Sequence, residues 1–219
     1  MAMNPLTMSK LPYKAEQLTP VALVAKQPFM LVAAPAFGPS TVQELIAYAK
    51  ANPGKVNYAA GSTPVHIAGE WMKILAGIDI VAIPYKGTAP SLVDMIGGRV
   101  QFMMGAVLTA VPHVREGRIR ALAVTGKKRI ASLPDLRTLD EADAPGFVVT
   151  TWQGLFAPAG MATPVLARVN AEFVKAIKSP DLRPKIEQQD MEPTAPGHVE
   201  FNAMYRAELA RWTKVAKDA

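Results

Sequence analysis

Short apolar runs alternate with helical patterns along most of this chain of 219 residues. The runs are rich in β-branched and other apolar residues, and they lie at 20–25, 29–35, 55–60, 78–85, 99–106, 119–126 and 148–158. Segments with apolar residues at helical spacing separate most of them. Strands that alternate with helices form βαβ units, whose strands are mainly parallel. The sequence therefore predicts an α/β protein with mainly parallel sheets.

The helical segments between these runs carry start and stop signals. Residues 40–54 begin with a capping-box pattern, Ser40 with Gln43, and stop at an Asn-Pro-Gly sequence. Residues 64–76 form a second amphipathic helix, which ends at Gly77. Its apolar face, which should be buried, comprises Val65, Ala68, Trp71, Met72 and Leu75. After residue 158 the pattern changes to long amphipathic helices.

Composition narrows the class of protein further. Half of the residues are hydrophobic and 19% are charged, which is typical of a folded globular protein. Cysteine is absent, so disulfides and thiolate metal sites are excluded. No apolar run approaches the ~20 residues of a membrane span. The first residues also lack the basic and apolar regions of a signal peptide.

The charged residues argue against nucleic acid as a partner. The formal net charge is +6, but few aromatic residues lie among the basic ones and no nucleic-acid-binding motif is present. We interpret the densest basic cluster as a solvated face; it comprises Arg115, Arg118, Arg120, Lys127, Lys128 and Arg129. The irregular segment 127–146 could cross between two lobes, and its acidic residues Asp140, Glu141 and Asp143 are interpreted as a solvated charge run.

Two turns between a strand and a helix combine small residues with hydroxyls. The first is Ala-Ala-Gly-Ser-Thr-Pro at 59–64, and the second is Pro-Tyr-Lys-Gly-Thr-Ala-Pro at 84–90. They could be mere punctuation, since Thr63 and Thr88 can cap the helices that follow. They could also form an anion-binding site, because helix N-termini present free backbone N–H groups and a positive dipole. In an open α/β sheet such turns collect at the carboxyl ends of the strands.

The residues give little support to catalysis or to a bound metal. His66 and Glu70 lie one helical turn apart, but no third ligand follows at a recognisable interval. Ser62, His66 and Asp94 make a triad only on paper, because Ser62 and His66 share one helix start instead of facing each other. Phosphate-binding glycine motifs are absent. We therefore expect no enzyme, no metal and no cofactor.

Long blocks of the sequence resemble the Bug receptors, the periplasmic solute-binding proteins of tripartite tricarboxylate transporters. The resemblance runs from about Leu11 to the C-terminus, and order and spacing of the blocks agree. The blocks are "LTPVALVA" (18–25), "TVQELIAYAKANPGKVNYAAGS" (41–62), "HIAGEWMKILAGIDIVAIPYKGTAPSLVDMIGGRV" (66–100), "VREGRIRALAVTGKKRIASLPDLRTLDEADAPGF" (114–147) and "WQGLFAPAGMATPVLARVNAEFVKAI" (152–177).

The resemblance implies a type-II periplasmic-binding-protein fold, in which two α/β lobes with mainly parallel sheets close on a small carboxylate. Residues 36–147 would form the second lobe. Residues 1–35 and 148–219 would supply the remainder of the first lobe with the C-terminal helices. Such receptors are not enzymes; they pass a mono- or dicarboxylate to the membrane permease of the transporter. By resemblance the protein is periplasmic, although this chain carries no signal peptide pattern.

The resemblance also implies the ligand-binding residues, and it favours the anion-binding interpretation of the two turns. One turn supplies Gly61, Ser62 and Thr63, with His66 at the family's histidine. We expect the His66 side chain to pack beneath this turn or to bond to it. The other turn supplies Tyr85, Lys86, Gly87 and Thr88. Where many relatives carry an aspartate after the next strand, this chain has Gly105.

One departure from the family pattern is large. The resemblance implies an N-terminally truncated receptor, because the secretion signal and the opening βαβ segment of the first lobe, with its glycine-rich loop, have no counterpart here. An incomplete sheet leaves an apolar edge that invites pairing. We therefore expect a homodimer, or a chain that covers this gap with its own N-terminal segment. The alternative to a carboxylate receptor is a truncated, self-associating remnant without ligand binding.

Overall fold

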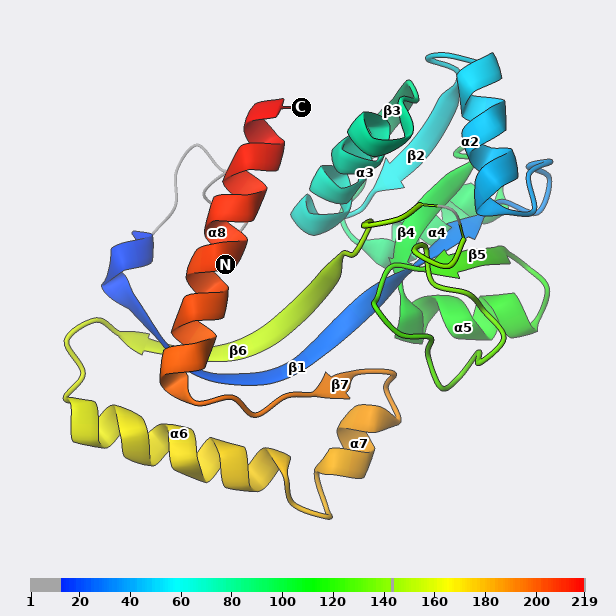
Figure 1. Cartoon of the computed structure of the whole chain (residues 1–219). Helices are drawn as coiled ribbons and strands as arrows, with labels where there is room; N and C mark the ends of the chain where they lie inside the picture. Colours follow the sequence, from blue (N-terminus) through cyan, green and yellow to red (C-terminus); the bar gives the residue numbers. More distant parts are fainter. Residues whose placement is uncertain (1–12, 143, 219) are drawn as a thin grey trace. The chain divides into compact units, whose positions relative to one another are not determined.

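The computed structural model describes residues 13–142 and 144–218 (Figure 1). The chain divides into two compact units. Unit 1 contains the N-terminal residues up to Gln27 together with 151–218, and unit 2 contains 28–150. The predicted second lobe, residues 36–147, lies inside unit 2. That the units act as ligand-binding lobes stays a prediction.

Unit 2 is built on five strands in the order β3-β2-β4-β1-β5. The strand β2 is parallel to both β3 and β4, whereas β1 is antiparallel to both β4 and β5. Four strands therefore run in one direction and only β1 runs against them, which confirms a mainly parallel sheet. The bounds are β1 Leu18–Ala33, β2 Val56–Ala60, β3 Ile80–Pro84, β4 Phe102–Ala106 and β5 Arg120–Val124.

The strand β1 is longer than the sequence pattern predicts. Residues 20–25 and 29–35 read as two strands, but the structure contains one strand of 16 residues that extends through both units. Pro28 lies inside it and cannot donate a ladder hydrogen bond. It is tolerated because it lies at the boundary between the units, where β1 changes its neighbours.

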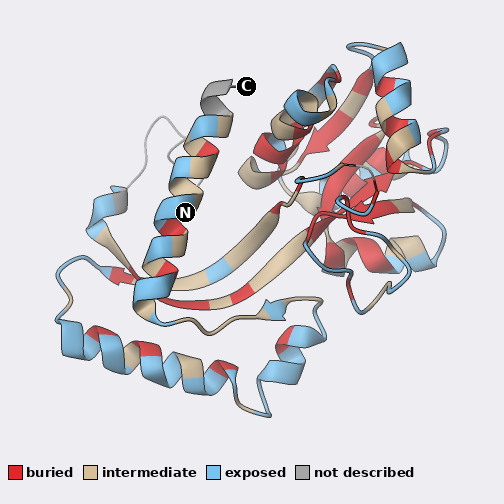
Figure 2. Cartoon of the chain, viewed as in Figure 1, coloured by how far each residue is buried: buried red, intermediate tan, exposed pale blue. Residues whose placement is uncertain are grey.

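Helices follow the strands of unit 2 directly and bury one face each. Figure 2 shows buried residues concentrated on the strands, with the exposed residues on the outer faces of the helices. The prediction for 64–76 holds for Val65, Ala68 and Met72. Trp71 is half-buried, and Leu75 is 51% exposed at a pocket that it lines with Met72. The bounds are α2 Val42–Ala51, α3 Thr63–Ala76, α4 Thr88–Ile96 and α5 Val107–Arg115.

The capping box of α2 is shifted by one residue from the prediction. Thr41 is the N-cap and accepts a hydrogen bond from the Glu44 backbone N–H at 3.1 Å. The Glu44 carboxylate in turn accepts from the Ser40 backbone N–H at 2.6 Å. This bond from Ser40 is the main reason why the pKa of Glu44 is lowered. A carboxylate outcompetes the Gln43 amide because it is the stronger acceptor and favours the positive end of the helix.

In unit 1 the strand β1 is flanked by helices on both faces of a small sheet. It pairs with β6 (Thr150–Pro158) and, antiparallel, with the short β7 (Glu192–Pro193). Alternate residues of β6 point to opposite faces, as the period of a strand requires. Ala157 packs with Leu166 of α6, whereas Gly154 leaves room for the Phe201 ring of α8. The helices are η1 Ala15–Gln17, α6 Thr163–Ile177, α7 Arg183–Glu187 and α8 His198–Asp218.

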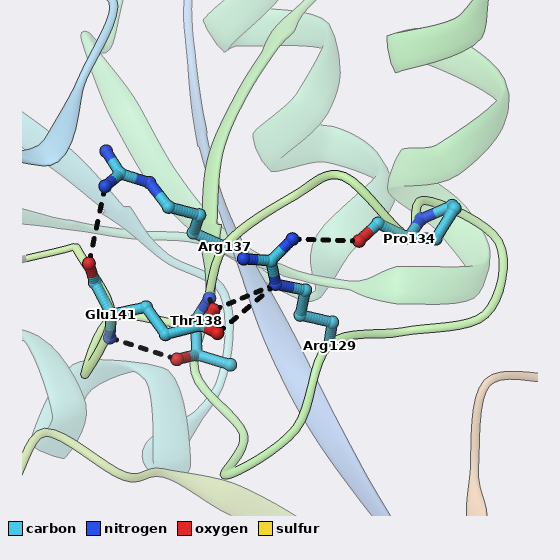
Figure 3. Close-up of polar contacts among 5 residues, drawn as sticks. All are labelled: Arg129, Pro134, Arg137, Thr138 and Glu141. Carbon is cyan, nitrogen blue, oxygen red and sulfur yellow. Dashed lines mark hydrogen bonds and ion pairs between the residues drawn. The ribbon is translucent and has the colours of Figure 1, made fainter.

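The irregular segment 127–146 lies within unit 2 and does not cross between the units. Figure 3 shows its polar contacts. The Thr138 backbone N–H donates to the Glu141 carboxylate at 2.8 Å, the Glu141 N–H donates to Thr138 Oγ1 at 3.1 Å, and Arg129 bonds to the same carboxylate at 3.0 Å. Asp140 accepts a bond from the Gly146 N–H. Asp140 and Glu141 are exposed, as expected of a solvated charge run, and they also organise the loop. Asp143 lies outside the described residues.

Two further predictions concern a membrane-spanning helix and the N-terminal segment. Among the residues that the structure describes, no helix is both long enough and apolar enough to span a bilayer. The prediction that the chain covers an incomplete lobe with its own N-terminal segment concerns residues 1–12, which lie outside the described residues.

Candidate functional site

The two predicted turns lie against each other at the carboxyl edge of the sheet in unit 2. Ala60 and Pro84 are register partners at the ends of the parallel strands β2 and β3. The Tyr85 backbone N–H donates to the Ala60 carbonyl at 3.1 Å. A Cβ added to Gly61 would lie 2.8 Å from the Gly87 carbonyl oxygen. Only glycine at position 61 allows this approach, so the turns form one continuous surface.

A third turn joins this edge at the end of β4. A Cβ on Gly105 would lie 3.8 Å from the Thr88 methyl carbon, so the two residues are neighbours. The resemblance led us to expect an aspartate in many relatives at this position. Because glycine adds no negative charge beside the N-terminus of α4, the surface keeps its positive polarity.

The helices that begin at this edge have open N-termini. The N-caps of α3, α4 and α5 are Ser62, Gly87 and Ala106, so Thr63 and Thr88 are the first helical residues and not the predicted caps. Within the described residues none of these three caps accepts a side-chain hydrogen bond, and no acidic residue lies in the first turn of these helices. By contrast, α2 is closed by its own Thr41 and Glu44. Helix N-termini without a side-chain cap are suited to bind an anion.

Exposure agrees with a surface that a ligand can reach. Three of the eight predicted residues are exposed and five are half-buried; the exposed ones are Ser62, His66 and Lys86. Lys86 supplies the one formal positive charge within the two turns. Gly87 adopts a φ of +108°, a conformation that side-chain-bearing residues rarely adopt.

Ser91 supports the two turns, although it was not among the residues predicted from the sequence. It is fully buried on α4, and its hydroxyl donates to the Gly87 carbonyl at 2.8 Å. A Cβ on Gly61 would also lie 2.9 Å from Ser91 Oγ. Ser91 therefore holds both turns in place. One feature of the sequence could have identified Ser91: it is a small polar residue among the otherwise apolar buried residues of α4, which include Leu92 and Met95.

Tyr85 uses its side chain away from the turns. Its hydroxyl donates to Asp94 Oδ2 at 2.8 Å, and Arg99 forms an ion pair with the other oxygen of Asp94 at 2.6 Å. The Tyr85 hydrogen bond and then Arg99 lower the pKa of Asp94, while burial and Asp94 raise the pKa of Tyr85. At neutral pH the carboxylate is charged and the phenol is neutral. Tyr85 therefore contributes to the turn through its backbone, and its predicted side-chain contact with a ligand stays a prediction.

His66 does not pack beneath the 61–63 turn. Its side chain is exposed, and its Nδ1 lies 3.4 Å from the hydroxyl of the buried Tyr58. This hydroxyl donates to Glu70 Oε1 at 3.1 Å, and Glu70 also pairs with Lys73 at 2.9 Å. The expected packing was wrong because Gly69 lets Tyr58 reach the helix surface beside His66: a Cβ there would lie 2.2 Å from Tyr58 Cζ.

The contacts of Glu70 also bear on the pair of possible metal ligands, His66 and Glu70. Glu70, which shares a helix face with His66, is occupied by Tyr58 and Lys73. In residues 13–142 and 144–218, no group of three or more histidine, cysteine, aspartate or glutamate side chains is placed to hold a metal ion.

Five of the six residues of the basic cluster are exposed, and only Arg120 is half-buried. Arg120 donates to the carbonyls of Phe37 and Pro39, at 3.1 and 2.9 Å. Arg118 pairs with Glu116, and Arg129 pairs with Glu141. Arg118 and Arg129 bond to loops of unit 2 and still remain exposed, as expected for a solvated basic face.

The comparisons with known proteins identify the family. The model of the tripartite tricarboxylate transporter family receptor matches residues 1–219. The chain belongs to this family. The UPF0065 protein in the tcbD-tcbE intergenic region of Pseudomonas sp. (strain P51) is 35% identical over 211 residues, which cover 94% of this chain and 62% of the relative. Protein BugT of Bordetella pertussis is 30% identical over 214 residues, which cover 96% and 66%. The chain therefore spans less than two thirds of these relatives.

Several solved structures share the fold. Rpa4515 of R. palustris with adipate has a TM-score of 0.88 at 32% identity, over 98% of this chain and 73% of that chain. The periplasmic binding protein BugD has a TM-score of 0.83 at 28% identity, over 99% and 74%. MatC from Rhodopseudomonas palustris with bound malate has a TM-score of 0.82 at 29% identity, over 98% and 75%. These structures confirm the predicted periplasmic-binding-protein fold, and the family is one of transport receptors and not of enzymes.

Proposed function

We propose that this Bug-type chain captures a small mono- or dicarboxylate and passes it to the membrane permease of a tripartite tricarboxylate-type transporter. One observation carries the proposal: the open N-termini of α3 and α4 lie side by side at the carboxyl edge of β2 and β3. Adipate and malate, the ligands of two structural neighbours, are both dicarboxylates. This supports a small carboxylate as the ligand class.

The chemistry of the turns suits a carboxylate. Backbone N–H groups of the two helix starts would replace the water that the anion loses, and the hydroxyls of Thr63 and Thr88 can donate further hydrogen bonds. Lys86 adds charge without the rigid geometry of an arginine. Backbone donors bind the carboxylate group and leave the remainder of the ligand to be selected by other parts of the receptor.

Closure of the two units would complete the site. Two crossing points link the units, one between Gln27 and Pro28 and the other between Thr150 and Thr151. A hinge motion at such crossing segments is a standard way for receptors to enclose a ligand.

We place the protein in the periplasm and its partner in the membrane. The support is the family description, together with the structural neighbour BugD, which is named a periplasmic binding protein.

The second candidate is a folded remnant that self-associates without a ligand. A groove of unit 1 favours it, since a pocket of about 370 Å³ lies between the start of β1 and α8. Tyr205 lines this pocket and is only 4% exposed. In the described part of the chain its hydroxyl has no hydrogen-bond partner. Such a group costs free energy unless another molecule satisfies it.

Thermal unfolding against a panel of acids separates the two candidates. The panel contains C3 to C8 mono- and dicarboxylates, with amino acids and aromatic acids for comparison. A ligand at a hundred times its Kd adds about 2.7 kcal/mol to the free energy of unfolding, which is visible as a higher midpoint. We expect a selective rise with one or a few small carboxylates. A chain that unfolds cooperatively but responds to none of them would support the remnant.

A further inference from the structure

The two crossing segments have different neighbours on the two sides of the unit boundary. In unit 1, Thr151 Oγ1 donates to the Gln27 carbonyl at 3.3 Å, so the segments are tied directly to each other. In unit 2, the two crossing segments are instead connected through a third residue. This residue is Thr125, which follows β5 and is fully buried.

The Thr125 side chain connects both crossing segments. Its Oγ1 accepts a hydrogen bond from the Phe29 backbone N–H at 2.8 Å. The same oxygen lies 2.6 Å from the Val149 carbonyl and 3.2 Å from the Phe29 carbonyl. A hydroxyl has one hydrogen to donate, and the closer Val149 carbonyl is the better acceptor. The side chain therefore accepts from one segment and donates to the other.

The Thr125 backbone repeats this arrangement. Its N–H donates to the Phe29 carbonyl at 2.9 Å, and its carbonyl accepts from the Val149 N–H, also at 2.9 Å. Side chain and backbone together hold Phe29 and Val149 to unit 2. Because all of these groups lie away from water, breaking any one of the bonds would leave a buried polar group unpaired.

Next to this residue the crossing strand β1 lacks a backbone donor. Pro28, the first residue of unit 2, has no N–H to contribute to a ladder. Gly126 packs closely on the Pro28 ring, since a Cβ at position 126 would lie 3.0 Å from Pro28 Cβ. Gln27 therefore forms its hydrogen bond in unit 1 and Phe29 forms its hydrogen bonds in unit 2. Pro28, which has no N–H, separates the two.

We propose that Thr125 is a positioning residue that sets the pivot of unit closure. It holds Phe29 and Val149 to unit 2, so that bending is confined to 27–28 and 150–151. The inference rests on the proposed function, since a pivot matters only in a receptor whose units close. Its test requires no ligand, so its failure can be told apart from a failure to bind carboxylates.

Distance measurements between the units test the proposal. The chain has no cysteine, so Lys50→Cys in unit 2 and Glu172→Cys in unit 1 give two unique, exposed sites for nitroxide labels. Pulsed electron paramagnetic resonance then reports the distribution of label distances. Thr125→Val replaces the hydroxyl with a methyl group, and we expect it to widen the distribution at least twofold. Thr125→Ser keeps the hydroxyl and should restore the unmodified width.

Thr138→Val is the matched control. Thr138 is also a buried threonine of unit 2, 2% exposed, whose hydroxyl accepts a bond from the Glu141 N–H within its own loop. We expect this variant to lower the melting temperature and to leave the distance distribution unchanged. An unaltered distribution in Thr125→Val would overturn the proposal. So would equal widening in both variants, since that indicates general loosening.

Hydrogen exchange on the unsubstituted chain covers the case in which Thr125→Val does not fold. The amides of Phe29 and Val149 should exchange at least tenfold more slowly than those of Gln27 and Thr151. Equal exchange on both sides of the boundary would contradict a pivot at 27–28 and 150–151.

Discussion

Gly61 and Gly87 meet at one contact but need to be glycine for different reasons. At Gly61 the restriction is space, because the Gly87 carbonyl occupies the place of a Cβ. At Gly87 it is backbone conformation, since φ is +108° and a Cβ would meet nothing within 4 Å. The contact of the two turns therefore depends on the absence of one side chain and on the freedom of one backbone.

Replacing Gly61 with alanine should separate the turns. The new Cβ would lie 2.8 Å from the Gly87 oxygen, so one turn must move. We expect a loss of about 1 to 3 kcal/mol in the free energy of unfolding and a fall in carboxylate affinity of about tenfold or more. Chemical denaturation and calorimetric titration measure both. The control is Gly38→Ala, which has open space around it and should change neither; equal effects at both positions would contradict the assignment.

The hydroxyls of Thr63 and Thr88 should contribute to binding more than to folding. Valine at either position removes a donor from the surface formed by the two turns. We expect each variant to lose about 1 kcal/mol of binding free energy, roughly fivefold in affinity. Thr41→Val is the contrast, because Thr41 caps α2 away from these turns. It should lose about 1 kcal/mol of stability without a change in affinity. Unchanged affinity in both Thr63→Val and Thr88→Val would mean that the ligand lies elsewhere.

At the scale of the element, the start of each helix distinguishes a structural role from a binding role. The helix α2 satisfies its own N-terminus with a threonine and a glutamate, whereas α3 and α4 leave theirs open. An acidic side chain in the first turn stabilises a helix. Without an acidic side chain in the first turn, α3 and α4 are less stable, but their N-termini can accept an anionic ligand.

Ala89→Glu tests whether a charge at the N-terminus of α4 raises stability and lowers ligand affinity. Ala89 is exposed and lies in the first turn of α4. A carboxylate there should raise the free energy of unfolding by about 0.3 to 1 kcal/mol through the helix dipole. It should also repel the ligand and weaken carboxylate binding by about tenfold. Ala89→Gln has nearly the same shape without the charge and should bind as the unsubstituted chain does. A glutamate variant that binds normally would remove the N-terminus of α4 from the site.

At the scale of the whole molecule, the groove of unit 1 determines whether the chain is expected to pair. The groove presents Glu16 from η1 and Arg206 from α8, so a second copy related by a twofold axis can match each charge with its opposite. The partner could also satisfy the buried Tyr205 hydroxyl. We therefore expect a weak homodimer in solution.

Charge reversal tests the homodimer. Glu16→Arg and Arg206→Glu alone place like charges opposite each other and should shift the equilibrium to monomer in sedimentation equilibrium. The double variant restores opposite charges and should recover the dimer. A monomeric unsubstituted chain would contradict the dimer, and a dimer that ignores both single variants would place its interface on another surface.

Much of the fold was accessible from the sequence because its signals are local. Strand and helix alternation depends on the period of apolar residues within about ten positions, and β2 to β5 lie within three residues of the predicted runs. The glycine, hydroxyl and proline residues of 59–64 and 84–90 likewise mark two turns without knowledge of their neighbours. By contrast, the one-residue shift of the α2 cap shows that even local signals leave helix ends uncertain.

Local sequence patterns therefore predict the types and order of the elements and the chemical character of the two turns. The contacts between distant residues follow only from the packing of the folded chain. This packing joined two predicted strands into β1, turned the Tyr85 hydroxyl to Asp94 and placed Thr125 between the crossing segments. These contacts join residues that are up to about a hundred positions apart, or they depend on space left by glycine. Side-chain direction is set by the packing of several elements at once, which no local period encodes.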